Sequence, residues 1–270
     1  MSAGAAILLG VVQGLTEFLP VSSSAHLILI RAFFGWDGND ALWEVFDVAC
    51  HVGTLLAVIV FFWSDLWAMV RAIPRALQAQ PDAAGRRLQL IAAGTVPIVL
   101  VGGLWGHALE ESVRTARVVV IPLAIGGALF FVAERLRRRR RREGDMGWID
   151  ALTIGAAQAA ALVPGVSRSG STITAGLLLG FDREAVARFS FLLSVPAIIA
   201  AAAKGALEMR HMALAPSDFQ IFAIGMATSA VVGYAAVAFL IRYLSTHRLD
   251  GFGWYRMALA AGTIAWLALR

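Results

Sequence analysis

The chain has 270 residues, of which 59% are hydrophobic and only 15% are charged, and its formal net charge is +5. A soluble domain carries about 25% charged residues, so the composition excludes an ordinary soluble protein and predicts an α-helical membrane protein. The basic excess does not predict a nucleic-acid partner, because the sequence lacks the interleaved aromatic and basic residues of single-strand-binding proteins.

The first apolar stretch, Ala3–Leu15, ends at a break that contains Pro20 and three serines, Ser22–Ser24, and Ala25–Phe34 follows. Because crossing a bilayer takes about 20 residues, neither apolar stretch is long enough alone. Together they predict a re-entrant helix–loop–helix, whose irregular loop must be surrounded by protein or by a water-filled cavity. The first stretch lacks a basic start, so we expect no cleavable signal peptide.

Longer apolar segments then follow in two groups of three, with a basic segment between the groups. The predicted spans are Val45–Trp63, Leu88–Trp105 and Val118–Ala133, then Phe189–Ala203, Phe219–Ile241 and Met257–Leu269. The basic segment, "ERLRRRRRREGDMG", is typical of a solvated cytoplasmic linker.

The two halves resemble each other. "QGLTEFLPVSSS" begins at Gln13 and "QAAALVPGVSRS" begins at Gln158, 145 residues later, and each contains a proline–serine break. The sequence therefore predicts one all-α polytopic membrane domain over residues 1–270, with repeat one at 1–135, the linker at 136–147 and repeat two at 148–270. Each repeat consists of a re-entrant helix–loop–helix plus three transmembrane helices. An odd number of spans in each repeat makes the two repeats inverted relative to each other.

The distribution of arginine predicts the orientation in the membrane. On this scheme one side carries Arg71, Arg75, Arg86, Arg87, Arg137–Arg142, Arg242 and Arg248, and the other carries Arg114, Arg117 and Arg210. The richer side is assigned to the cytoplasm. Both termini then face outward, and the two re-entrant loops enter from opposite faces and meet near the midplane.

The second break, "LVPGVSRSGSTIT", places Arg168 at bilayer depth. This costs roughly 2.5–3.5 kcal/mol, so we expect an anionic ligand to compensate the guanidinium. Hydroxyl groups of Ser167, Ser169 and Thr172 are candidate donors to a phosphate. A helix that begins near Ser171 would add its first N–H groups.

The first break supplies complementary groups. Gln13 and Glu17 share one helix face and are candidate oxygen ligands of a divalent cation, Mg²⁺ or Ca²⁺. Ser22 is a further phosphate-binding candidate. Ser23 and His26 are candidates for a nucleophile and an acid–base group. The residues alone leave open whether Ser23 attacks with His26 as its base or His26 attacks directly.

The segments "QGLTEFLPVSSSAH" and "PGVSRSGST" together resemble the two signature segments of the bacterial undecaprenyl-diphosphatase family, and the resemblance covers the whole chain. It implies hydrolysis of undecaprenyl diphosphate to undecaprenyl phosphate and inorganic phosphate, a step that supports peptidoglycan synthesis and bacitracin resistance. It also implies that the family's acidic element falls on Gln13 and Glu17, its active-site histidine on His26 and its phosphate-binding element, with Arg168, on Pro164 to Ser169. With Ser23 from the first break, the expected catalytic set is Glu17, Ser23, His26 and Arg168. Many members carry Glu where this chain has Gln13, so Glu17 is the firmer metal ligand.

A different class of protein also matches the architecture. Inverted repeats with broken helices at the midplane are typical of transporters, so a polyprenyl-phosphate flippase or anion-coupled transporter without phosphatase chemistry is the alternative. The expected partners are a polyprenyl diphosphate and membrane lipids. The sequence leaves a homo-oligomer open.

Overall fold

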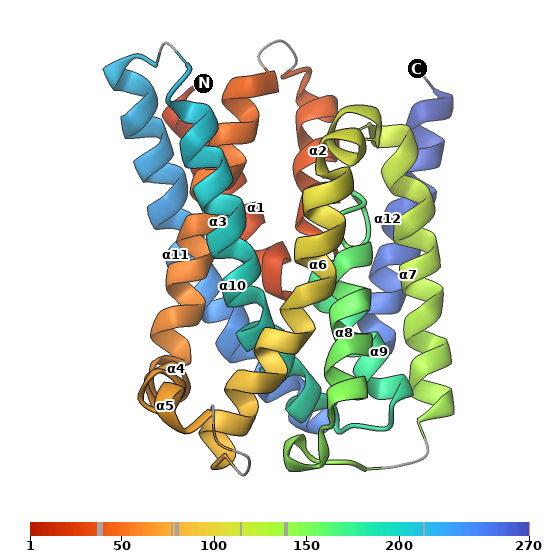
Figure 1. Cartoon of the computed structure of the whole chain (residues 1–270). Coiled ribbons are helices and arrows are strands. Elements are labelled where there is room, and N and C mark those ends of the chain that lie inside the picture. The colour runs from red at the N-terminus through yellow and green to blue at the C-terminus, as the bar shows by residue number, and fades with distance from the viewer. Residues whose placement is uncertain are drawn as a thin grey trace.

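A computed structural model of the chain describes residues 1–36, 40–76, 78, 81–113, 115–137, 140–212 and 214–269. Arg114, Arg138 and Arg139 of the predicted arginine pattern lie outside these residues. All secondary-structure elements of these described residues are helices (Figure 1). In chain order they are α1 Ala3–Phe18, α2 Ser23–Phe34, α3 Asp40–Phe61, α4 Trp63–Arg71, α5 Ile73–Ala76, α6 Ala83–Val113, α7 Ala116–Leu136, the 3₁₀ turn η1 Glu143–Asp145, α8 Trp148–Ala160, α9 Arg168–Leu178, α10 Arg183–Met209, α11 Pro216–Thr246 and α12 Asp250–Ala268.

Five of the described helices are long and apolar enough to cross a bilayer. They contain Leu42–Phe61, Ala83–Leu104, Ala116–Leu136, Arg183–Leu207 and Pro216–Thr246. This confirms a multi-pass helical membrane protein and the first five predicted spans. The sixth predicted span, Met257–Leu269, lies in α12, which is not among the five; Asp250 and Arg256 lower the mean hydropathy of that helix.

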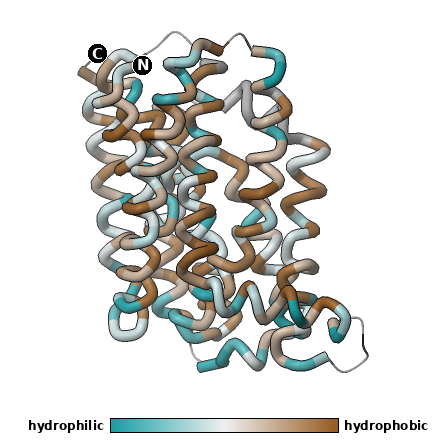
Figure 2. The backbone as a smooth tube through the Cα atoms, turned by 90° about the vertical axis from the view of Figure 1, so that its left-hand side faces the viewer, coloured by the Kyte–Doolittle hydropathy of each residue, from teal (hydrophilic) through white to brown (hydrophobic). Residues whose placement is uncertain are grey.

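Figure 1 places both termini at one end of the bundle, with α4, α5 and the segment from α7 into α8 at the opposite end. Hydrophobic residues dominate the long helices between the ends, and hydrophilic residues gather at the end that carries α4 and α5 (Figure 2). The molecule therefore has the polarity of a bilayer-embedded bundle, with an apolar middle.

Two short breaks interrupt the bundle, as the sequence predicts. Between α1 and α2 the chain turns at Ser22, whose backbone has a φ of 75°, in the left-handed region that a non-glycine residue rarely adopts. Ser22 Oγ accepts from the N–H of Ala25, which caps α2. Between α8 and α9, Ser167 caps α9 by accepting from the N–H of Gly170, so α9 begins at Arg168 and not near Ser171.

Helices from one half of the sequence pack against helices from the other half. The first helix of the first half, α1, lies along α11 of the second half, and α8 lies along α6 of the first. Glycines permit this contact at backbone distance: a Cβ on Gly155 would lie 2.1 Å from the carbonyl oxygen of Gly94, and one on Gly53 of α3 would lie 2.2 Å from that of Met226 in α11. A larger side chain at Gly53 or Gly155 would force these helices apart.

Arg141, within the basic linker, has specific partners. It forms an ion pair with Asp150, 2.7 Å apart, and its guanidinium lies 4.2 Å from the centre of the Phe181 ring. Burial alone would raise the pKa of Asp150, but hydrogen bonds from Arg141 and from the N–H of Gly147 hold that pKa below its ordinary value. Arg141 is therefore held against α8 and against Phe181, which precedes α10.

Arg256 of α12 joins both breaks to the bundle. It is 1% exposed, and its guanidinium donates to the carbonyl oxygens of Pro122 at 2.9 Å, Gly165 at 3.0 Å, Leu123 at 3.2 Å and Pro20 at 3.4 Å. Pro20 belongs to the first break and Gly165 to the second. One side chain therefore holds both irregular segments against α7.

We expect Arg256→Met to lower the midpoint of thermal unfolding in detergent by about 5 °C or more, because it leaves buried carbonyl groups without donors. The exposed Arg242, on α11, provides the control: Arg242→Met should leave the midpoint within about 1 °C. Equal midpoints for the two variants would contradict the role assigned to Arg256.

Candidate active site

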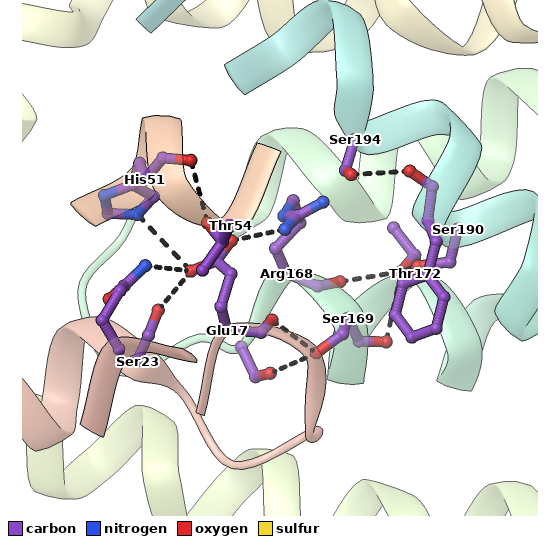
Figure 3. Close-up of polar contacts among 12 residues, drawn as sticks. Glu17, Ser23, His51, Thr54, Arg168, Ser169, Thr172, Ser190 and Ser194 are labelled. Atoms are coloured by element: carbon purple, nitrogen blue, oxygen red, sulfur yellow. Dashed lines mark hydrogen bonds and ion pairs between the residues drawn. The ribbon is translucent and has the colours of Figure 1, made fainter. Parts of the chain in front are cut away.

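The two breaks meet at the carboxylate of Glu17, near the end of α1. Glu17 is 6% exposed, and its Oε1 pairs with the guanidinium of Arg168 at the start of α9. Its Oε2 accepts from Ser23 Oγ at 2.7 Å and from Gln13 Nε2 at 2.8 Å. The ring nitrogen Nε2 of His51 lies 3.4 Å from the same oxygen. Figure 3 shows Ser23 and His51 on one side of this carboxylate and Arg168 on the other.

A cavity of about 390 Å³ opens beside this cluster. Its polar wall comes from both breaks and from α3, α8 and α10, through Glu17, Ser22, Ser23, Ser24, His51, Gln158, Ser167, Arg168 and Lys204. Its apolar wall comes from α6, α10 and the second break, through residues such as Ile98, Val99, Leu162, Val166, Ala197 and Ile198. The cavity thus joins a polar end to an aliphatic surface.

The charges in the cavity wall favour an anion. Of the residues that line the cavity, Arg168 and Lys204 are cationic and Glu17 is anionic. Arg168 uses one terminal nitrogen, Nη2, for Glu17, while Nη1 is buried and has no hydrogen-bond partner among the described residues. A forked guanidinium with an unused donor suits a phosphate oxygen.

Two of the predicted phosphate-binding hydroxyls point elsewhere. Ser169 Oγ donates to the carbonyl oxygen of Leu19 at 3.3 Å, and Thr172 Oγ1 lies 2.8 Å from the carbonyl oxygen of Arg168 and 2.6 Å from Ser190 Oγ (Figure 3). Both residues are buried, and neither lines the cavity. Their hydroxyls hold the second break against the first and α9 against α10, whereas Ser22 and Ser167 do reach the cavity.

His26 also lies outside the cavity. Its Nδ1 donates to the carbonyl oxygen of Ser22 at 2.7 Å, which leaves Nε2 to accept from the hydroxyl of Tyr255, also at 2.7 Å. The two rings stack with centroids 5.7 Å apart. Both ring nitrogens are engaged away from Glu17 and Arg168, and in this geometry His26 supports the turn at Ser22.

The cavity wall also contains polar residues to which the sequence analysis assigns no role: Ser24, His51, Gln158 and Lys204. The signal that points to the last three is their polarity within or beside apolar helices. Asp47, one turn before His51, pairs with Arg31, and His51 Nδ1 donates to the backbone carbonyl oxygen of Asp47 at 2.7 Å.

The described residues contain no group of three or more His, Cys, Asp or Glu side chains arranged to hold a metal ion. Glu17 supplies a carboxylate, and Gln13 supplies an amide oxygen, Oε1, that is buried and has no partner in the described part of the chain. Mg²⁺ is commonly held by one or two such ligands together with substrate phosphates. Both oxygens of Glu17 already take Arg168, Ser23 and Gln13, and Gln13 is not part of the cavity wall, so these residues do not form a cation site by themselves. A cation at Glu17 would need further ligands from a phosphate.

The cavity geometry predicts which positions a small, water-soluble thiol reagent can reach. Cys50 is the single cysteine of the chain and is fully buried, so the background should be low. We expect Ser23→Cys and Ser24→Cys to react at least tenfold faster than Ser190→Cys, because Ser190 is fully buried between α9 and α10. Labelling by a methanethiosulfonate, followed by mass spectrometry, measures the rates. Equal rates at Ser23 and Ser190 would exclude this cavity.

Comparisons with known proteins agree with this geometry. Residues 6–262 match the family model described as bacitracin resistance protein BacA. The undecaprenyl-diphosphatase of Rubrobacter xylanophilus is 50% identical in an alignment of 269 residues, and the match covers 98% of this chain and 98% of its own. That of Chlorobium phaeobacteroides is 42% identical and covers 97% of this chain and 96% of its own. That of Caldicellulosiruptor bescii is 42% identical and covers 98% and 97%. With a match that runs almost from end to end, this chain belongs to the BacA bacitracin resistance family.

Proposed function

We propose that the chain hydrolyses undecaprenyl diphosphate to undecaprenyl phosphate and inorganic phosphate. This activity recycles the lipid carrier of peptidoglycan synthesis and supports bacitracin resistance, in line with the family and with the names of its relatives. The observation that carries the proposal is a cavity in which a cationic, hydroxyl-lined end continues into an aliphatic wall.

The two parts of the cavity correspond to the two parts of such a substrate. Arg168, with Ser22 and Ser167, offers donors to the diphosphate. Ile98, Val99 and Ile198 offer an apolar surface to the first prenyl units. The remainder of the long prenyl chain would stay among the membrane lipids, which are its natural solvent.

Ser23 is the proposed nucleophile, because it lines the cavity and its hydroxyl donates to Glu17 Oε2. Ser23 Oγ attacks the terminal phosphorus while Glu17 takes the hydroxyl proton. The bond from that phosphorus to the bridging oxygen breaks, and undecaprenyl phosphate leaves. Water then attacks the phosphorus of the phosphoserine, the bond from that phosphorus to Ser23 Oγ breaks, and Glu17 returns its proton to Oγ. Inorganic phosphate leaves, and Ser23 and the Glu17 carboxylate are restored.

The other residues act by binding and orientation. Arg168 balances negative charge on the transferring phosphoryl group, a reaction whose catalysis rests mostly on positioning and electrostatics. Gln13 donates to Glu17 and orients its carboxylate. His26 holds the backbone at Ser22, next to the nucleophile. Ser169 and Thr172 keep the second break in place.

A divalent cation, Mg²⁺ or Ca²⁺, is proposed to bind together with the diphosphate. Glu17, and Gln13 through its unpartnered Oε1, would hold it. When bound, such an ion supplies charge neutralisation on the phosphate oxygens.

The orientation in the membrane is also part of the proposal. The two repeats are inverted, which agrees with termini at one end of the bundle, the linker at the other and the reciprocal packing of α1 on α11 and α8 on α6. The arginine-rich linker end faces the cytoplasm across a bacterial inner membrane. The cavity then opens toward the outer face, where the product forms.

Phosphate release from undecaprenyl diphosphate by the purified protein, reconstituted in lipid vesicles, tests the proposal. We expect Ser23→Ala to lower kcat by about 1000-fold or more, because the covalent step is lost. Arg168→Lys should lower it by about 100-fold, because a point charge cannot replace the guanidinium fork. Ser245→Ala, at an exposed position on α11, is the control and should match the unmodified protein.

Absence of phosphate release by the unmodified protein, with transfer of the lipid between leaflets, would favour the flippase or transporter. Transport needs an anion site but no nucleophile, so Ser23→Ala would then retain activity. Full hydrolysis by Ser23→Ala would contradict the assigned nucleophile.

Chelation tests the cation separately. EDTA should lower phosphate release at least tenfold, and Mg²⁺ or Ca²⁺ added in excess should restore it, because the ion offsets charge on the diphosphate. The unfolding midpoint measured in the same samples controls for loss of folded protein. Unchanged activity in EDTA would leave Glu17 with only the base role.

A further inference from the structure

Gln158, in the last turn of α8, has a buried side-chain amide with nothing to bind. The residue is fully buried, and neither Nε2 nor Oε1 has a hydrogen-bond partner among the described residues. It nevertheless forms part of the cavity wall, together with Ser167 and Arg168. A buried amide left unsatisfied destabilises the folded protein, so its presence at this wall calls for a ligand.

The other half of the chain shows what the same position does when it has a partner. Gln13 precedes Gln158 by 145 residues and is also fully buried, and its Nε2 donates to Glu17 Oε2 at 2.8 Å. Four positions after Gln158, where the first half has Glu17, the second half has Leu162. An aliphatic side chain offers no acceptor. The side-chain amide of Gln13 therefore orients a carboxylate, whereas the corresponding amide of Gln158 has no such acceptor four positions later.

A second donor without a partner among the described residues belongs to Arg168, another residue of the same cavity wall. Arg168 Nη1 is buried and has no partner in the described part of the chain, while its Nη2 is bound to Glu17. Two donors, one from an amide and one from a guanidinium, thus belong to one cavity wall. A ligand with several anionic oxygens on one atom can accept from both, and a phosphate group is such a ligand.

We propose that Gln158 is a further substrate-binding residue, whose Nε2 donates to a phosphate oxygen alongside Arg168. The inference rests on the proposed function for the identity of the phosphate, which is either the terminal group that becomes inorganic phosphate or the group that stays on the lipid. Gln158 touches the ligand and takes no part in bond breaking.

The decisive variant is Gln158→Leu, which keeps the size of the side chain and removes both polar atoms. Because the amide lacks partners, its removal should leave the unfolding midpoint unchanged or raise it. The KM for undecaprenyl diphosphate should rise about tenfold to a hundredfold, as expected for a lost hydrogen bond to a charged group, with a smaller change in kcat. Gln158→Glu should raise KM further, because a carboxylate repels the phosphate.

Gln89 of α6 is the matched control. Its side chain is partly buried, whereas that of Gln158 is fully buried. Its Nε2 donates to the carbonyl oxygen of Ala76 at 2.7 Å, and the residue lies outside the cavity wall. Gln89→Leu should lower the unfolding midpoint and leave KM unchanged, which is the opposite pattern.

Product inhibition separates the two phosphates. If Gln158 binds the terminal phosphate, Gln158→Leu weakens inhibition by inorganic phosphate as well as raising KM. If it binds the lipid-linked phosphate, inhibition by undecaprenyl phosphate weakens and that by inorganic phosphate does not. Either pattern supports the proposal.

A readout without turnover keeps this inference distinct from the proposed function. Inorganic phosphate and undecaprenyl phosphate should each slow methanethiosulfonate labelling of Ser23→Cys. Adding Gln158→Leu should raise about tenfold the concentration needed of the ligand whose phosphate Gln158 binds. This measurement remains valid if the unmodified protein releases no phosphate from the lipid. A Gln158→Leu variant with unchanged KM and unchanged protection by phosphate and by undecaprenyl phosphate would overturn the proposal, as would one that only loses stability.

Discussion

The ion pair between Glu17 and Arg168 is the contact on which the arrangement of the site depends. Glu17 lies near the end of α1 in the first half of the chain, and Arg168 begins α9 in the second. Each residue stands beside one of the two breaks, in a helix that is too short to cross a bilayer. A single charge at such depth is costly, and removing one member of a buried pair leaves the other uncompensated, at about 3–5 kcal/mol. The two breaks therefore stabilise each other, and neither loop geometry is explained without the other. The pair uses Nη2 of Arg168 and leaves Nη1 without a partner in the described part of the chain.

Much of the fold follows from the sequence, because hydropathy reports directly whether a segment of about 20 residues prefers lipid to water. Five spans, both breaks and the basic segment between the halves were predictable on this basis. Hydropathy does not predict a helix correctly where that helix buries polar groups inside the protein. In α12 the guanidinium of Arg256 counts as a strongly polar residue, yet four backbone carbonyl oxygens solvate it within the bundle. The partner of Arg141 within the basic segment was not predicted for a related reason, since composition does not reveal the ion pair that Arg141 forms with Asp150.

The candidate site was predictable in its position but not in the direction of each side chain. The sequence brought the two breaks together and included Glu17, Ser23 and Arg168, which do lie in contact. It could not separate residues that face the cavity from neighbours that hold the loops, because both kinds are small, polar and adjacent in sequence. Ser167, which caps α9, lines the cavity, whereas the hydroxyls of Ser169 and Thr172 in α9 bind backbone carbonyl oxygens away from it. His26 is three residues from Ser23 in the sequence, but its side chain contacts the backbone of Ser22 and the hydroxyl of Tyr255. Gln158 was visible only as a repeat of Gln13, and the loss of its acceptor becomes meaningful once the cavity is known.

The packing of helices from one half against helices from the other also limits how this molecule can move. In a rocking transporter, two bundles rotate against each other as rigid bodies, and their contact must slide. Here a boundary between the two halves of the sequence would cut the contacts of α1 and α3 with α11 and that of α8 with α6, where backbone atoms meet at Gly53 and Gly155. Such contacts have no flexible side chains to accommodate sliding. Large rotations are therefore confined to other boundaries, and the lipid substrate must reach and leave a nearly stationary site through the aliphatic wall of the cavity.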